Sequence, residues 1–196
     1  MRLRFKHTML ETNHLILAIP CSTLREVDVE PGLIPSDQWE AIQTLHDGTN
    51  AKILLPVLQK PPQPTFGFGK EALFGFNRDR SVLTAYLAGE TGLFFPLERT
   101  RRSSAPLLFP QRKVGSPVAL AWGNEPFSKG SYSNYGKGQY EIFNQTIKEQ
   151  GEEVRRVFRS IDNALFLAGE HTSVKSPATL EGAVDAGQKA ARILSK

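Results

Sequence analysis

The chain has 196 residues, of which 40% are hydrophobic and 22% are charged, and this composition excludes a chain that is disordered throughout. Its formal net charge is +4, and the excess is concentrated in one stretch. The basic residues of that stretch are Arg99, Arg101, Arg102, Arg112 and Lys113. Because aromatic residues do not alternate with them, we interpret the stretch as a solvated loop and expect no nucleic-acid partner.

Cysteine usage and the length of the apolar runs narrow the class of protein further. The single cysteine, Cys21, excludes an internal disulfide and a cysteine-based metal cluster, so we expect no metal and a reducing, cytoplasmic compartment. Basic residues precede the apolar run from Leu15 to Cys21 and could mimic a signal peptide. That run is too short for one, which favours a buried strand. No stretch is long enough to span a membrane as a helix.

The first 60 residues carry patterns for a strand, a helix and a second strand. The apolar run His14–Pro20 ends at a proline and is typical of a strand covered on both faces, as in an α/β layer. Ser36 is expected to cap a helix. The apolar face of that helix is formed by Trp39, Ile42 and either Leu45 or His46. A strand is then predicted over residues 51–58, in which Pro56 favours an edge or a bulge.

Strands and one helix are predicted in the middle of the chain. Two strands, at residues 72–76 and 82–88, are joined by the charged turn Asn77–Arg80, and another is expected at 117–122. The apolar spacing over residues 139–150 predicts a helix of about three turns. A charged connector or strand follows over 152–161, and a turn is expected at Asp162–Asn163.

The end of the chain is expected to form a strand, a loop and a helix. An apolar run closes on Gly169–Glu170, and Thr179 is a good N-cap for a helix whose first turn contains Glu181. One stripe of this helix is expected to face a neighbour: Leu180, Ala183, Val184, Gly187, Ala191 and Leu194. The free N–H groups of the first turn are suited to an anionic or electron-rich ligand group. The alternative is a strand, loop and helix that only close an α/β domain.

The residues in this stretch resemble a known flavin-binding signature. The run Ala168-Gly-Glu-His-Thr-Ser173, followed by Thr179-Leu-Glu-Gly-Ala183, is similar to the C-terminal signature of the flavin-containing amine oxidases, which include monoamine, polyamine and L-amino-acid oxidases. The resemblance implies that Glu170 lies along the ribityl-pyrophosphate part of FAD. It also implies that Thr179 and Leu180 place backbone N–H groups on the flavin pyrimidine edge. A helix N-terminus there favours the negative charge of the reduced flavin.

Two further segments resemble the same family and suggest catalytic residues. The order of elements up to Gly48-Thr-Asn-Ala-Lys52 implies that Lys52 reaches the flavin N5 through a water. The alternative for Lys52 is a strand lysine whose ammonium extends to the surface. Glu125-Pro-Phe-Ser-Lys-Gly-Ser-Tyr132 is similar to a segment that carries an aromatic wall of the amine site, with Tyr132 at the wall position. Otherwise Tyr132 is a half-buried tyrosine bonded to backbone.

The sequence also departs from the family pattern. Ser131 stands where monoamine oxidases carry the cysteine joined to FAD, so the flavin is expected to be noncovalent. Thr179 stands where they carry a second tyrosine of the amine site, so Tyr132 and Thr179 are the expected substrate-binding pair. The resemblance fails between Thr91 and Gly115. The glycine-rich turn that cradles the FAD pyrophosphate has no counterpart in the chain.

We therefore expect an α/β fold, the C-terminal portion of a two-lobed FAD-dependent amine oxidase. Residues 1–29 and 122–196 are assigned to the FAD-binding lobe and residues 30–121 to a mixed-sheet substrate lobe. The expected activity is oxidation of a small amine to an imine, with O2 reduced to hydrogen peroxide. The alternatives are a noncatalytic fragment or subunit that needs a separate N-terminal chain or a second copy, and a flavin-independent binding domain that uses the basic loop.

Overall fold

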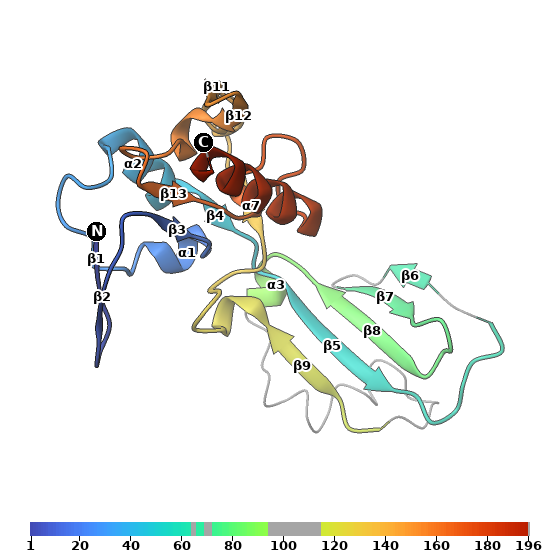
Figure 1. Cartoon of the computed structure of the whole chain (residues 1–196). Coiled ribbons are helices and arrows are strands. Elements are labelled where there is room, and N and C mark those ends of the chain that lie inside the picture. The colour runs from blue at the N-terminus through green and yellow to red at the C-terminus, as the bar shows by residue number, and fades with distance from the viewer. Residues whose placement is uncertain (64–65, 69–71, 94–114, 196) are drawn as a thin grey trace. The chain divides into compact units, whose positions relative to one another are not determined.

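The computed structural model describes residues 1–63, 66–68, 72–93 and 115–195, and its elements are drawn in Figure 1. The chain forms two compact units, one made of Met1–Asp47 and Tyr132–Lys196 and the other of Gly48–Ser131. The units thus divide after residues 47 and 131, whereas the sequence-based lobes divide after 29 and 121. The assignment of either lobe to cofactor or substrate stays a prediction, and the whole basic stretch at 99–113 lies outside the described residues.

The first unit is built on a parallel pair of strands. β3 (Leu15–Leu17) pairs with β13 (Leu165–Leu167), and the three residues of β13 are all buried. This confirms both predicted strands, although each is shorter than expected. The buried β13 has the continuous apolar sequence of a strand covered on both faces. The prediction that β3 is also covered on both faces is wrong, because Ile16 is 41% exposed.

Short helices enclose the core of this unit. α1 (Cys21–Leu24) and α2 (Ser36–Thr44) pack on η2 (Arg156–Phe158) and on the strand pair. Ile42 and Leu45 are fully buried, which confirms the predicted apolar face and selects Leu45 over the exposed His46. The predicted cap at Ser36 is wrong by one residue. Pro35 is the N-cap, and it makes no side-chain hydrogen bond because its ring carries no hydrogen-bonding atom.

Three small antiparallel pairs complete the first unit. β1 (Arg2–Arg4) pairs with β2 (Met9–Glu11), β4 (His46–Asp47) with β10 (Ser133–Asn134), and β11 (Thr146–Glu149) with β12 (Glu152–Arg155). The helix predicted over residues 139–150 is wrong. Only α6 (Tyr140–Phe143) is helical, and exposure alternates along β11 up to a turn at Gln150 and Gly151 with positive φ. That alternation has the period of a strand, and the turn folds β11 back on β12.

The C-terminal helix, α7 (Leu180–Leu194), starts at the predicted cap. The Thr179 hydroxyl accepts a hydrogen bond from the Gly182 N–H at 3.0 Å. The predicted buried face is wrong, because Leu180 is 84% exposed and Val184 53% exposed. The buried positions of α7 are Gly182, Ala186, Lys189, Ala190 and Ile193. Both stripes consist largely of small residues, so helical spacing alone did not decide which one faces β13.

The second unit contains an antiparallel sheet of five strands in the order β6-β7-β8-β5-β9. The strands are β6 (Phe66–Phe68), β7 (Leu73–Phe76), β8 (Val82–Leu87), β5 (Ala51–Pro56) and β9 (Val118–Ala121). Between β7 and β8 lies the predicted turn, where the Arg80 N–H bonds the Asn77 carbonyl at 3.0 Å. Two short helices, α3 (Glu90–Leu93) and η1 (Trp122–Asn124), flank the sheet strands in sequence.

β5 is an inner strand of this sheet, so the expectation of an edge is wrong. It pairs with β8 along its whole length and with β9 from Ala51 to Leu54. Pro56 lies beyond that pairing with β9, where its missing N–H costs no ladder bond, and its carbonyl accepts the Gly115 N–H at 2.8 Å. Alternate residues of β5 are buried and exposed, which gives the sheet one apolar face.

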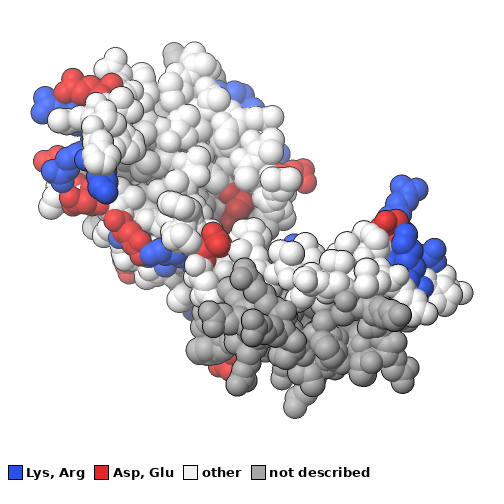
Figure 2. Space-filling view, turned by 90° about the horizontal axis from the view of Figure 1, so that it is seen from below, with Lys and Arg blue, Asp and Glu red and all other residues white. Residues whose placement is uncertain are grey.

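Charges on the described surface are mixed. On the face drawn in Figure 2, Lys and Arg lie beside Asp and Glu. Ion pairs at the surface include Arg2 with Glu11 at 2.7 Å and Arg4 with Asp28 at 3.3 Å. Within the described ranges, no helix combines the length and apolar character needed to cross a membrane.

Candidate functional site

The predicted site begins at the turn that follows β13. Gly169 has a φ of 140°, which L side chains rarely adopt, and a Cβ there would lie 2.6 Å from the imidazole Cε1 of His171. This turn starts the short helix η3 (Glu170–Thr172). Glycine at 169 thus allows the chain to fold back so that Glu170 leaves the strand at a fixed position.

The carboxylate of Glu170 connects two other segments of the first unit. Its Oε1 accepts the Ser133 N–H at 2.7 Å. Its Oε2 accepts the Ser133 hydroxyl at 2.7 Å and the Ala178 N–H at 2.6 Å. We call this set of three hydrogen bonds the Glu170 bridge. It holds the start of β10 and the residue before Thr179 on one side chain.

The start of α7 offers main-chain donors beside this bridge. Leu180 and Glu181 precede the first N–H group with an intrahelical acceptor, so their own N–H groups have no partner in the helix. The Leu180 side chain is 84% exposed, which leaves the helix start uncovered by described residues of this unit. The helix dipole adds partial positive charge there. This donor set fits an electron-rich ring edge such as that of a reduced flavin.

Four of the five predicted site residues come from the first unit. Tyr132 is 41% exposed and directly precedes the buried Ser133. Thr179 is exposed and directly follows Ala178. The Glu170 bridge therefore brings Tyr132, Glu170, Thr179 and Leu180 into one region, although they are separated by up to 48 positions in sequence.

Lys52, the fifth predicted residue, belongs to the second unit. It lies on the exposed face of β5, opposite Tyr86 of β8, and its Nζ is 5.6 Å from the centre of the Tyr86 ring. A cation over an aromatic face is weakly attracted, and this contact holds the ammonium above the sheet. Ser131 belongs to the same unit, where its hydroxyl donates to the Gly48 carbonyl at 3.0 Å and accepts from the Asn50 amide at 2.5 Å.

Sequence reasoning missed two buried polar groups of the first unit, Arg155 and His171. Arg155, at the end of β12, is 1% exposed and donates to the carbonyls of Ser173 and Phe143. Burial lowers the pKa of its guanidinium, while negative charge, including that of Glu170, opposes the shift. His171 packs edge-on against Phe158, and burial lowers its pKa to about 4. Nothing in their sequence spacing marked either residue as buried.

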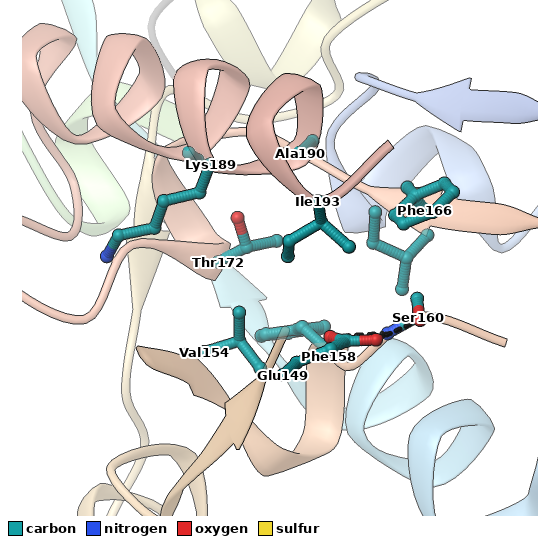
Figure 3. Close-up of a pocket in the computed structure, with 11 residues that line it drawn as sticks. Glu149, Val154, Phe158, Ser160, Phe166, Thr172, Lys189, Ala190 and Ile193 are labelled. Carbon is teal, nitrogen blue, oxygen red and sulfur yellow. Dashed lines mark hydrogen bonds between the residues drawn. The ribbon is translucent and has the colours of Figure 1, made fainter. Parts of the chain in front are cut away.

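A small cavity lies between α7 and the β11–β12 hairpin (Figure 3). It measures about 30 Å³, and Figure 3 shows Ser160 bonded to Glu149 at its lower edge. A volume of that size holds about one water molecule, so the cavity is too small for an amine or a cofactor. The start of α7 is taken as the candidate functional site of the first unit because of its main-chain donors and the Glu170 bridge.

Comparison with known proteins relates this arrangement to a family. A family model described as "Flavin containing amine oxidoreductase" matches residues 4–195. The chain is 27% identical over 121 residues to "Lysine-specific histone demethylase 1 homolog 1" of Oryza sativa subsp. japonica. This match covers 56% of this chain and 13% of that protein. Over 78 residues it is 36% identical to "Protein FLOWERING LOCUS D" of Arabidopsis thaliana, which covers 38% of this chain and 8% of that protein.

A solved structure extends the comparison over nearly the whole chain. Cyclohexylamine oxidase from Brevibacterium oxydans IH-35A matches with a TM-score of 0.72 at 17% identity, over 99% of this chain and 45% of that one. At this identity the match shows the fold alone, and it confirms the predicted α/β portion of an amine oxidase fold. The chain thus spans less than half the length of each of these three proteins.

Proposed function

Because this chain belongs to the family of flavin-containing amine oxidoreductases, we propose that it is the C-terminal part of an FAD-dependent amine oxidase. The proposed reaction takes two hydrogens from an amine, one from carbon and one from nitrogen, and gives the imine while O2 becomes hydrogen peroxide. FAD, when bound, supplies the hydride acceptor of this reaction. A cytoplasmic location is part of the proposal and rests on the single cysteine.

The observation that carries the proposal is the uncovered N-terminus of α7 beside the Glu170 bridge. The N–H groups near Thr179 and Leu180 are available to the flavin pyrimidine edge, where they stabilise negative charge on the reduced ring. Glu170, held by Ser133 and Ala178, is proposed to lie along the ribityl chain of FAD. Such preorganised donors need no rearrangement when the ring is reduced.

The remaining predicted residues are proposed to act on the amine and on O2. Tyr132 and Thr179 are proposed to bound the amine, with the tyrosine ring as an apolar wall. Lys52 is proposed to hold a water for the flavin N5 with its ammonium, which would also favour negative charge on reduced oxygen. Its exposure on β5 leaves the ammonium accessible for that role. The substrate is proposed to be a small amine, in line with the family.

A second candidate is a noncatalytic fragment or subunit that acts only with a separate N-terminal chain. The observation that favours it is that the matched region covers 45% of the cyclohexylamine oxidase chain. Exposed apolar side chains on α7, Leu180 and Val184, are consistent with a surface that another segment covers. In this case the partner supplies the glycine-rich half of the FAD site.

The proposal is tested by producing the chain together with the polypeptide encoded immediately upstream of it. The purified complex is expected to show stoichiometric flavin absorbance and to release peroxide when an amine is added. Denaturation in acid is expected to release free FAD into the supernatant, because Ser131 cannot form a thioether. Flavin that stays with the precipitated protein would contradict the noncovalent assignment, and a complex without flavin would contradict the proposed function.

A further inference from the structure

We propose that the carboxylate of Glu170 is a positioning group that sets the placement of Tyr132 relative to Thr179. The inference rests on the proposed function, because these two side chains are the ones proposed to bound the amine. Glu170 accepts hydrogen bonds from Ser133, which follows Tyr132, and from Ala178, which precedes Thr179.

On the Tyr132 side, the bridge fixes the start of β10. Ser133 is 5% exposed, and both its N–H and its hydroxyl donate to Glu170 at 2.7 Å. Tyr132 lies in the bend that directly precedes β10, and it is 41% exposed. The peptide that joins Tyr132 to Ser133 carries the N–H group that Glu170 accepts, so the bridge fixes the backbone directly after Tyr132.

On the Thr179 side, the bridge holds an unusual backbone conformation. Ala178 has a φ of 62°, a region that residues with a Cβ rarely occupy. Its N–H donates to Glu170 at 2.6 Å. Thr179 follows immediately, accepts from the Gly182 N–H and donates to the Ser176 carbonyl at 2.7 Å. The bond to Ala178 thus fixes the peptide that leads into the cap of α7.

Glu170 itself reaches both segments from a third part of the chain. It lies 37 positions from Ser133 and 8 from Ala178, and both of its oxygens accept main-chain N–H groups. A carboxylate so engaged acts through the groups it holds rather than by contact with the amine. This is why we assign a positioning role to its side chain.

The first test uses the full chain and the variant E170Q. Glu170 accepts the Ser133 and Ala178 N–H groups on different oxygens, and glutamine replaces one of these oxygens by an NH2 group, which cannot accept an N–H. Amide hydrogen exchange, followed by NMR, is expected to become at least tenfold faster at one of these two positions. The matched control is E149Q, because Glu149 accepts the Ser160 N–H and hydroxyl in the same manner within the same unit. Unchanged exchange at both positions in E170Q would overturn the proposal.

The second test uses the flavin-loaded complex described above. In the E170Q complex that holds flavin, the amine Kd, taken from the amine dependence of anaerobic flavin reduction, is expected to rise by about tenfold, since a displacement near 1 Å at a binding site can cost that much. E149Q is expected to leave the amine Kd unchanged. If Glu170 had a purely structural role, both variants would have a lower midpoint of thermal unfolding, but their amine Kd values would not differ. An unchanged amine Kd in E170Q, despite faster exchange, would overturn the positioning role.

Two further outcomes are separated by design. If E170Q does not fold, S133A removes only the hydroxyl bond and is expected to raise the amine Kd by a smaller factor, whereas no change would count against the proposal. A wild-type complex that binds no flavin is recognised before any variant is compared. That result contradicts the proposed function, and it also contradicts the proposal that Glu170 positions Tyr132 for an amine.

Discussion

Lys52 and His171 illustrate how differently two polar residues depend on their surroundings. Lys52 alternates with the buried Ala51 and Ile53 along β5, so its exposure follows from strand periodicity. His171 belongs to the quoted signature, yet its burial follows from contacts with Phe158 and Gly169 that are made only in the folded chain. The proposed role of the first residue and the pH dependence of the second can both be measured.

For Lys52, we predict that K52M slows reoxidation of the reduced flavin by about a hundredfold in the flavin-loaded complex. The physical reason is the loss of an oriented cation that stabilises negative charge on oxygen, worth about 3 kcal/mol. Stopped-flow absorbance measures reoxidation, and anaerobic reduction by the amine is expected to change far less. K60M is the matched control, since Lys60 is another exposed lysine of the same unit. Equal reoxidation rates in K52M and wild type would exclude Lys52 from the mechanism.

For His171, we predict that the free energy of unfolding falls as the pH is lowered from about 6.5 to about 4. Burial lowers the pKa of the folded imidazole to about 4, whereas the unfolded chain takes up a proton near its ordinary pKa of 6.5. The unfolded state thus binds more protons in this window, and the loss is up to about 3 kcal/mol. Urea unfolding of wild type and H171Q at several pH values measures the difference.

The same prediction has a direct spectroscopic check. The NMR signal of the His171 ring should not titrate above pH 5 in the folded chain, even if H171Q proves too unstable to compare. A midpoint near pH 6.5 for this ring would contradict the buried, neutral imidazole.

At the scale of elements, α7 has two stripes of small residues, and either could have been its buried face. The buried face of α7 contains Gly182, Ala186 and Ala190, which recur every four residues, whereas Gly187 lies on its exposed face. A Cβ at Gly182 would lie 1.9 Å from the Ser176 carbonyl oxygen, so the loop before α7 can approach only because residue 182 has no side chain. Nothing lies within 4 Å of a Cβ at Gly187.

We therefore predict opposite effects for the same substitution at two positions of α7. G182A should destabilise the fold by about 1–3 kcal/mol, because backbone must move to admit the methyl group. G187A should stabilise it by up to about 1 kcal/mol, since alanine loses less entropy than glycine in a helix. Midpoints of denaturant unfolding compare the two. Destabilisation by G187A would indicate that the exposed face of α7 is packed against something.

At the scale of the whole molecule, the chain carries the main-chain donors that we propose for the flavin edge, but its sequence has no counterpart of the glycine-rich turn expected to hold the pyrophosphate. The chain covers 45% of the cyclohexylamine oxidase chain. The pyrophosphate is the most strongly charged part of FAD, and it depends on main-chain N–H groups that neutralise it. Its recognition and that of the flavin ring are thus expected to come from different segments.

We predict that this chain by itself neither retains FAD nor oxidises amines. Losing three charge-assisted hydrogen bonds of about 1.5 kcal/mol each weakens binding by roughly three decades. The measurement is to add excess FAD to the purified chain, remove free cofactor by gel filtration, and record flavin absorbance and amine-dependent peroxide. Stoichiometric flavin together with turnover would show that the chain builds a complete site.

The sequence by itself determined those features that depend on neighbouring residues. The apolar runs of β3 and β13, the turn between β7 and β8, and the Thr179 cap of α7 all follow from local side-chain chemistry. The signature around Glu170 also led to the family that the comparisons confirm. Local patterns sufficed there because each involves residues a few positions apart.

Tertiary structure decided those features that depend on contacts between segments distant in sequence. It turned part of the predicted helix at 139–150 into β11, because that strand pairs with β12. It placed β5 inside its sheet and selected the buried face of α7. It also gave Glu170 its partners, since Ser133 lies 37 positions away and has no pattern that links it to a glutamate. Such contacts arise from packing between distant segments, for which sequence periodicity carries no signal.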